Sequence, residues 1–287
     1  MPMRFGREVK DHWLVDYQNP GLPHVQQGWV LPPGREKAFD PFILMADDWF
    51  KRGTFSDHPH RGFQTITYVI DGRLEHVDNA GGYSVLDAGD VQYMNAGSGA
   101  RHAEEAYGDD LIHTLQLWLN LPERLKGTDS FYQNIRVEEA PVVPVEGGTV
   151  RVYSGEIAGA TGPMESLVPI TMAEVSLREG AEYMHVLPEN HNAFVYMLAG
   201  EAAFGESGVR LPKTAAATLT FNEEGDASVQ SELKIRAEQR SRMLIYSGVP
   251  LRESVIARGP FVMNSEEEIR QAFFDFRAGK FGPPAES

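Results

Sequence analysis

The sequence predicts an all-β protein built from two β-barrel domains and a C-terminal α-helix. Three observations lead to this prediction. Short apolar stretches in the first half are separated by turn residues at intervals of about 8–12 residues, a rhythm typical of barrels and sandwiches. A segment of the second half resembles one in the first half. A stretch near the C-terminus carries apolar residues at helical spacing.

Turn residues delimit the strands of the first half. Asp71-Gly72 is a hairpin signal, and Asn79–Gly82 and Gly89-Asp90 mark further turns. The stretches between them are rich in Val, Ile, Thr, Tyr and Phe, the residues that favour strands. We therefore predict strands over residues 41–46, 63–70, 73–77, 83–86, 91–94 and 113–120.

An internal repeat predicts the second barrel. The segment Tyr68–Gly72 resembles Tyr196–Gly200, which begins 128 residues later, and Leu121-Pro122 matches Val249-Pro250 at the same offset. Two matches at one offset indicate a duplicated domain, although short apolar runs that end in Gly also occur by chance.

The C-terminal helix is predicted from its start signal and its periodicity. Asn264 and Ser265 are capping residues, and the three glutamates that follow suit a helix N-terminus. Apolar residues then recur at i, i+3, i+4 and i+7 on one helical face: Ile269, Ala272, Phe273 and Phe276. Gly279, Gly282 and Pro283 are expected to end the helix.

Composition excludes several classes of function. The 287 residues carry a net charge of −15 and scattered basic residues, which disfavours direct binding of nucleic acid. The absence of cysteine excludes disulfides and thiolate metal sites. No apolar run approaches the ~20 residues of a membrane span. Residues 1–16 are charged and lack the apolar core of a signal peptide, so a cytoplasmic location is expected.

Two short runs contain the residues that indicate chemistry. His58 and His60 form one i, i+2 pair, and His102 and Glu104 form another. On strands, i and i+2 side chains point to the same face, so two facing strands would offer three imidazoles and one carboxylate to one ion. Four ligands leave positions of an octahedral metal open for substrate or O2. These ligand types suit Fe, Mn, Co, Ni, Cu and Zn, so they do not fix the metal.

The other histidines have no comparable context. They are expected to be structural or solvated: His12, His24, His76, His113, His185 and His191. Shifting the four candidate ligands by 128 residues gives Val186, Pro188, Gln230 and Glu232, of which only the glutamate suits a metal. We therefore expect a metal-binding first barrel over residues 1–125 and a connector over residues 126–145. Residues 146–287 are expected to form a metal-free second barrel followed by the helix.

Several stretches together resemble the pirin family. They are the run His58–Phe63, the hairpin Tyr68–Gly72, Gly89–Gln92, the loop Asn95–Gly99 that leads to His102-Ala103-Glu104, Leu115–Pro122 and the tail Ala272–Gly282. The resemblance implies two jelly-roll barrels of the cupin superfamily, face to face, with a mononuclear iron site in the first. It also implies the same four ligands: His58, His60, His102 and Glu104. One residue departs from the family motif, because Gln64 stands where the family has Glu.

The resemblance implies two classes of function. Some pirins are quercetin dioxygenases that open the ring of a flavonol with O2, and others, notably eukaryotic ones, are transcriptional co-regulators that act through protein partners. In the first class Glu104 would be the catalytic base for the substrate hydroxyl. A third possibility is a cupin enzyme with another oxidisable substrate. The candidates for the pocket or for contact with the ligands are Phe63, Gln64, Tyr68, Met94, Gln116 and Trp118.

Overall fold

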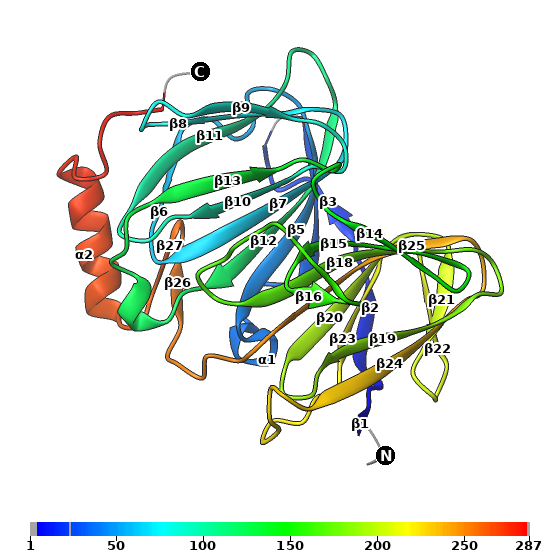
Figure 1. Cartoon of the computed structure of the whole chain (residues 1–287). Helices are drawn as coiled ribbons and strands as arrows, with labels where there is room; N and C mark the ends of the chain where they lie inside the picture. The colour runs from blue at the N-terminus through cyan, green and yellow to red at the C-terminus, as the bar shows by residue number, and fades with distance from the viewer. Residues whose placement is uncertain (1–4, 23, 286–287) are drawn as a thin grey trace. The chain divides into compact units, whose positions relative to one another are not determined.

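A computed structural model describes residues 5–22 and 24–285 (Figure 1). The chain divides into two compact units, and neither is a continuous segment. We call the unit formed by Asp16–Ala38, Phe42–Val137 and Leu251–Ser287 the first barrel. The unit formed by Met1–Val15, Phe39–Pro41 and Glu138–Pro250 is the second barrel.

The first barrel is built from two antiparallel sheets. The larger sheet has the strand order β13-β10-β7-β12-β5-β4-β3. Its strands are β3 (Tyr17–Gln18), β4 (Val25–Leu31), β5 (Phe42–Phe50), β7 (Phe63–Asp71), β10 (Val91–Asn95), β12 (Ile112–Asn120) and β13 (Phe131–Ile135). The smaller sheet has the order β6-β11-β8-β9. Its strands are β6 (His58–His60), β8 (Leu74–Asp78), β9 (Tyr83–Leu86) and β11 (Ala100–Ala106).

The C-terminal segment completes the first barrel. A hairpin of β26 (Ile256–Arg258) and β27 (Phe261–Met263) precedes helix α2 (Glu266–Arg277). Apolar residues of the hairpin, the helix and the tail form one cluster around Phe261. The backbone of Arg61 forms an isolated β-bridge with Phe261, and its side chain forms an ion pair of 2.8 Å with Asp275. The segment therefore lies with the barrel that carries β6, whereas sequence order predicts it after the second barrel.

Helix α2 begins and ends as its sequence predicts. The Ser265 side chain caps the helix by accepting a hydrogen bond from the Glu268 backbone N–H, and acidic residues occupy the first turn. Gly279 follows the helix with a φ of +74°. Two other helical segments are short: α1 (Glu36–Phe39) and the 3₁₀ turn η1 (Glu123–Leu125).

The second barrel also contains two large sheets. One has the order β14-β15-β18-β25-β20-β23-β2. Its strands are β2 (Val9–Leu14), β14 (Val142–Val145), β15 (Gly148–Ser154), β18 (Ile170–Leu177), β20 (Asn192–Ala199), β23 (Ala215–Leu219) and β25 (Ser241–Gly248). The other has the order β1-β24-β21-β22, with β19 also paired to β24. Its strands are β1 (Phe5–Gly6), β19 (Glu182–Pro188), β21 (Glu201–Phe204), β22 (Val209–Pro212) and β24 (Gln230–Ala237). A separate small hairpin joins β16 (Glu156–Ile157) and β17 (Ala160–Thr161).

The N-terminal strands belong to this second barrel. Strand β1 pairs in parallel with β24, and β2 pairs with β23. Buried Arg7 fixes the segment by donating hydrogen bonds to Ser231 Oγ and to the carbonyls of Thr220 and Pro188. Residues 5–15 therefore lie outside the barrel to which sequence order had assigned them.

The repeated motif takes the same conformation in both barrels. Gly72 follows β7 and Gly200 follows β20, with φ values of +78° and +72°. A Cβ atom at either position would lie within 3 Å of backbone, namely the carbonyl oxygen of Leu111 or of Arg240. The left-handed turn and the close approach both require glycine, which explains why the two halves share it.

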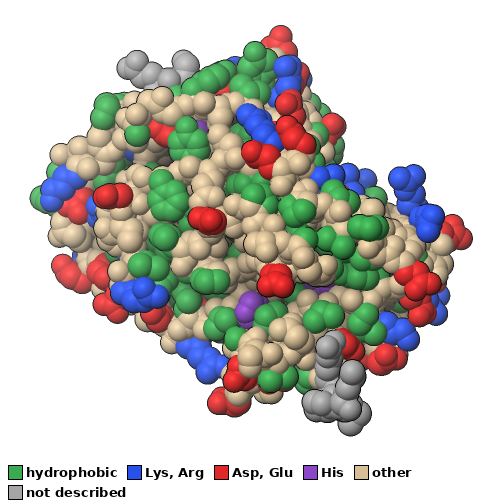
Figure 2. Space-filling model, viewed as in Figure 1, with side chains coloured by type: hydrophobic (Ala, Val, Ile, Leu, Met, Phe, Trp, Pro, Cys, Tyr) green, Lys and Arg blue, Asp and Glu red, His purple; other side chains and the backbone are tan. Residues whose placement is uncertain are grey.

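Charged residues are dispersed on the face of the molecule that Figure 2 shows. On the face seen in Figure 2, Lys and Arg side chains lie among Asp and Glu and form no continuous basic surface. Within residues 5–22 and 24–285, no helix is long and apolar enough to cross a membrane.

Candidate metal centre and cavity

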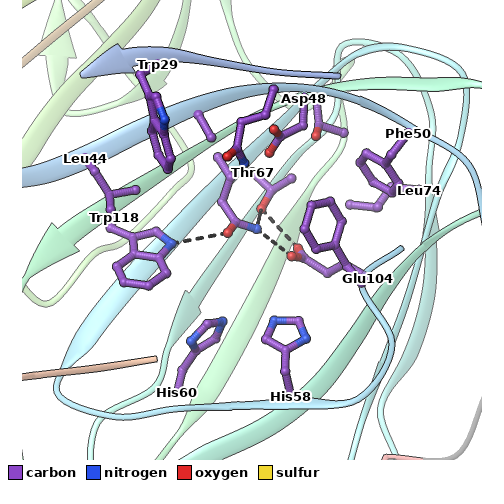
Figure 3. A pocket seen from close by; sticks show the side chains of 15 residues that line it. Trp29, Leu44, Asp48, Phe50, His58, His60, Thr67, Leu74, Glu104 and Trp118 are labelled. Carbon is purple, nitrogen blue, oxygen red and sulfur yellow. Dashed lines mark hydrogen bonds between the residues drawn. The ribbon is translucent and has the colours of Figure 1, made fainter. Parts of the chain in front are cut away.

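A cavity of about 240 Å³ opens in the first barrel (Figure 3). Aromatic and aliphatic side chains supply most of its exposed surface: Trp29, Leu44, Ala46, Phe50, Phe55, Leu74 and Trp118. Two groups of polar side chains interrupt that wall. One contains His58, His60, Glu104, Thr67 and Gln116, and the other contains Gln27, Asp48 and Thr114. Such a cavity suits a flat, largely apolar molecule that carries a few polar groups.

Three imidazoles meet beside the cavity because β6 pairs with β11. In this antiparallel pair His102 lies opposite His58, and Ala100 lies opposite His60. The centroid of the His102 ring is 4.5 Å from that of His58 and 5.0 Å from that of His60. One nitrogen from each ring lies within 4.8 Å of the others, a spacing that could hold a metal ion.

The hydrogen bonds of the three rings also fit a metal. His58 Nδ1 lies 2.8 Å from the Ser56 carbonyl oxygen, which fixes the proton on Nδ1 and leaves the Nε2 lone pair free. Both ring nitrogens of His60 and His102 are buried without a hydrogen-bond partner. Burial lowers the pKa of His60 and His102 well below the ordinary value, so both rings are neutral at pH 7. Neutral, buried and unsatisfied imidazoles are the donors that a divalent transition metal requires.

Glu104 is held beside these rings by neutral donors. Thr67 Oγ1 donates to Oε1 over 3.1 Å, and Gln116 Nε2 donates to Oε2 over 2.5 Å. Trp118 Nε1 in turn donates to Gln116 Oε1 over 3.2 Å. One potential ligand atom from each of Glu104, His102 and His76 lies within 4.8 Å of the others. These residues form a second cluster, which shares His102 with the first. The four predicted ligands are therefore neighbours, but they do not form a single cluster.

His76 is a site residue that the sequence did not reveal. It lies on β8 directly opposite Glu104 of β11, fully buried, and neither ring nitrogen has a hydrogen-bond partner. Asp78 Oδ2 is 3.8 Å from its Nε2, too far for a hydrogen bond. The sequence predicts a structural or solvated histidine at this position, because only the pairing of β8 with β11 brings His76 to Glu104.

Asp48 is a second site residue that the sequence did not reveal. It lies on β5 with 5% of its surface exposed, and it lines the cavity. Burial raises the pKa of its carboxyl to about 7, and the charges of Asp47 and Glu104 add to the rise, while a hydrogen bond from Gln27 opposes it. The apolar pattern of residues 42–46 indicated a strand there, but nothing in that pattern showed which face the acidic residues would occupy.

The predicted pocket residues divide into two groups. Gln116 and Trp118 line the cavity, and Phe63 lies behind them, stacked on Trp118 at 4.1 Å between ring centroids. The remaining three do not line it. Tyr68 is buried elsewhere in the core, and Met94 packs in a separate cluster with Ala96 and Ala100.

Gln64, a predicted candidate for the pocket or for contact with the ligands, faces away from the cavity. Its Oε1 accepts a hydrogen bond of 2.6 Å from Tyr93 Oη, and its Nε2 donates to the Asn120 carbonyl over 3.2 Å. Gly62, with a φ of +86°, interrupts the extended conformation between β6 and β7. The alternation therefore restarts at Phe63, so the Glu-to-Gln departure from the family motif does not change the cavity wall.

The second barrel has different residues at the positions 128 residues after the four candidate ligands. Val186 pairs with Glu232 and Pro188 with Gln230 on β19 and β24. Val186, Pro188 and Gln230 line a cavity of about 470 Å³ there, and the neighbouring Leu187 and Leu233 belong to a buried, largely aliphatic cluster. Among the described residues, both clusters of three potential metal ligands lie in the first barrel.

Comparisons with known proteins match both halves of the chain. The family model for pirin covers residues 15–119, and that for the pirin C-terminal cupin domain covers residues 172–282. The chain is 39% identical to pirin of Homo sapiens over 250 residues, which span 86% of this chain and 84% of that protein. It is 30% identical to a crystal structure of quercetin 2,3-dioxygenase from Acinetobacter baumannii, with a TM-score of 0.84 and coverage of 96% and 99%. The bacterial pirin YhhW of Escherichia coli, solved in complex with nickel(II), shares the fold at 20% identity, with a TM-score of 0.66 and coverage of 84% and 100%.

Proposed function

Since the chain belongs to the pirin family of the cupin superfamily, we propose that it is a metal-dependent dioxygenase that opens the heterocyclic ring of quercetin-like flavonols with O2. The observation that carries this proposal is a cluster of three imidazoles, two of them buried without a hydrogen-bond partner, beside a cavity with a largely aromatic wall that Glu104 also lines. The likeness to a quercetin 2,3-dioxygenase along nearly the whole chain supports it.

The residues present fit one divalent transition metal. We propose that His58, His60 and His102, which form one cluster, hold it, and that an oxygen of Glu104, which clusters with His102 and His76, is the fourth ligand. When bound, such a metal supplies reactivity toward O2 and lowers the pKa of a hydroxyl group beside it. Fe(II) is our first choice because of the family, and Mn, Co, Ni, Cu and Zn are alternatives that the same ligands accept.

The cavity wall would bind and orient the flavonol. Trp29, Phe50 and Trp118 offer flat apolar surfaces on which the fused rings can pack, and they exclude water from the reacting face. Because the histidines lie on one side of the cavity, the substrate edge with the 3-hydroxyl group would face them.

Glu104 is the proposed base. Its carboxylate would accept the proton of the 3-hydroxyl group, and the hydrogen bonds from Thr67 and Gln116 hold it in position to do so. Both donors are neutral groups that do not readily give up a proton. They therefore orient the carboxylate and leave it free to accept the proton of the substrate.

A second candidate function belongs to another class. The family resemblance implies co-regulators among the eukaryotic pirins, and the 39% identity to Homo sapiens pirin therefore supports a metal-bearing regulatory protein of the co-regulator type that acts through protein partners without turnover.

Oxygen consumption separates the two functions. Protein loaded with Fe, Mn, Co, Ni or Cu is mixed with quercetin, and O2 uptake and carbon monoxide release are followed together. The dioxygenase releases carbon monoxide as quercetin disappears. No uptake with any of the five metals would contradict the enzyme and favour the regulatory protein.

A further inference from the structure

We infer that Asp48 is a specificity-determining residue: its carboxyl group hydrogen-bonds a hydroxyl group on the part of the substrate that lies away from the histidines. The protein would thereby select polyhydroxylated flavonols over those that carry only the 3-hydroxyl group. This inference rests on the proposed function for the identity of the substrate. It assigns a role to a residue that lies outside both clusters of potential metal ligands.

The register of the large sheet builds a polar strip around Asp48. Gln27 of β4 pairs with Asp48 of β5 on one side, and Thr114 of β12 pairs with it on the other. Directly paired residues point to the same face of a sheet, and all three line the cavity. Figure 3 places Asp48 on the side of the cavity opposite His58 and His60. A flat molecule with one edge at the histidines would therefore present another edge to this strip.

One oxygen of Asp48 lacks a protein partner. Its Oδ1 is buried and has no hydrogen bond within the described residues. Buried polar atoms are nearly always satisfied, so an unsatisfied one in a cavity wall indicates a group that a ligand completes. Glu104 differs, because Thr67 and Gln116 already engage both of its oxygens.

The surroundings favour a neutral hydroxyl group over a charged group as the ligand. Trp29, Ala46 and Phe50 form the adjacent wall, and an apolar wall disfavours a full charge. The charged neighbours are acidic, namely Asp47 on the same strand and Glu104 across the cavity, and they would repel a second anion. With its pKa raised to about 7, the carboxyl is partly protonated at neutral pH, so it can accept a hydrogen bond from a phenol or donate one to it.

The test compares two flavonols and three variants. Quercetin and 3-hydroxyflavone share the 3-hydroxyl edge, but only quercetin has further hydroxyl groups. Dissociation constants are measured without O2 by quenching of tryptophan fluorescence in metal-loaded protein, and kcat and KM are measured with O2. Wild-type protein should bind quercetin more tightly. Asp48→Leu should weaken quercetin binding about 10-fold and change 3-hydroxyflavone binding less than about 2-fold. Asp48→Asn should retain the preference, because an amide also donates and accepts hydrogen bonds.

Controls make each outcome decisive. Asp47→Asn alters the neighbouring carboxylate, which contacts Tyr17 and His113 instead of the cavity, and it should leave the preference unchanged. If Asp48→Leu does not fold, Asp48→Ala replaces it. Equal weakening for both flavonols, or no change for either, overturns the inference. Flavonol binding without turnover overturns the proposed reaction but leaves the preference measurable, whereas wild-type protein that binds neither flavonol overturns both.

Discussion

Gln116 Nε2 donates a hydrogen bond of 2.5 Å to Glu104 Oε2, and Trp118 Nε1 fixes the other end of the same amide. The two residues come from different sheets, β12 and β11, so the contact links the two walls of the first barrel. Because the amide donates only from nitrogen, it orients the Glu104 carboxylate without supplying a readily transferred proton.

Replacement of Glu104 by Gln should damage turnover far more than metal retention. The amide oxygen can still coordinate weakly and three histidines remain, but the amide cannot accept the substrate proton. We expect turnover of quercetin to fall by about 10²–10⁴-fold while most of the metal is retained. Metal content and turnover are measured on the same preparations. Full turnover in Glu104→Gln would show that this carboxylate is not the base.

Metal loading should give about one ion per chain, since both ligand clusters share His102 and lie in one barrel. The double variant His58→Ala/His102→Ala should lose tight binding because it removes two of three clustered imidazoles. His12→Ala, which changes an exposed histidine of β2, serves as the matched control. Elemental analysis after mild Fe(II) loading checks the stoichiometry, and two tight sites or unaffected binding in the double variant would contradict it.

Gln64→Glu should destabilise the protein and leave the pH profile of turnover unchanged. The new carboxylate would lose the donor to the Asn120 carbonyl and would be buried as a charge at a site with 0% exposure. We expect a loss of about 2 kcal/mol or more in the free energy of unfolding at pH 7, and a smaller loss at pH 4, where the carboxyl is protonated. Urea unfolding at both pH values measures this. A shifted pH profile with normal stability would place residue 64 in the cavity.

Asp48 should make the stability of metal-free protein depend on pH. Its pKa is about 7 in the folded state and about 3.8 when unfolded, so between these values the folded state holds a proton that the unfolded state has lost. The free energy of unfolding therefore falls as pH rises from about 4 to 7, by up to about 1.4 kcal/mol per pH unit from this group. Asp48→Asn removes that dependence, so its stability relative to wild type should increase across this window. A constant difference from pH 4 to pH 8 would rule out a raised pKa.

Lys126→Met should loosen the C-terminal hairpin. The buried Lys126 ammonium donates to the carbonyls of Gly62 and Val262 and to Asn120 Oδ1, at 2.6, 3.0 and 3.0 Å. Removing it leaves three buried acceptors short of a donor, which should lower the free energy of unfolding by about 3 kcal/mol.

Hydrogen exchange of residues 256–263 should accelerate in Lys126→Met, and metal retention should fall, because Gly62 follows the ligand His60 by two residues. Lys51→Met, at an exposed position, is the control. Unchanged exchange in the hairpin would show that Lys126 does not fasten it.

Local sequence patterns determined much of the fold. The turn glycines, the strands between them in the first half and the apolar face of helix α2 all appear where their patterns predict, because turn chemistry, strand propensity and helical periodicity act over a few residues. The i, i+2 spacing of His58 with His60 likewise placed both side chains on one cavity, since a strand of three residues already fixes their common face.

Tertiary structure decided what depends on pairing between distant segments. His76 reaches Glu104 only because β8 pairs with β11, and Asp48 joins the cavity only through the register of β5 with β4 and β12. A single left-handed residue, Gly62, turned Gln64 away from the site. The N-terminal segment belongs to the second barrel and the C-terminal segment to the first, the reverse of their sequence order. Sheet edges and apolar clusters bind whichever segment has a complementary surface. Distance along the chain does not determine that choice.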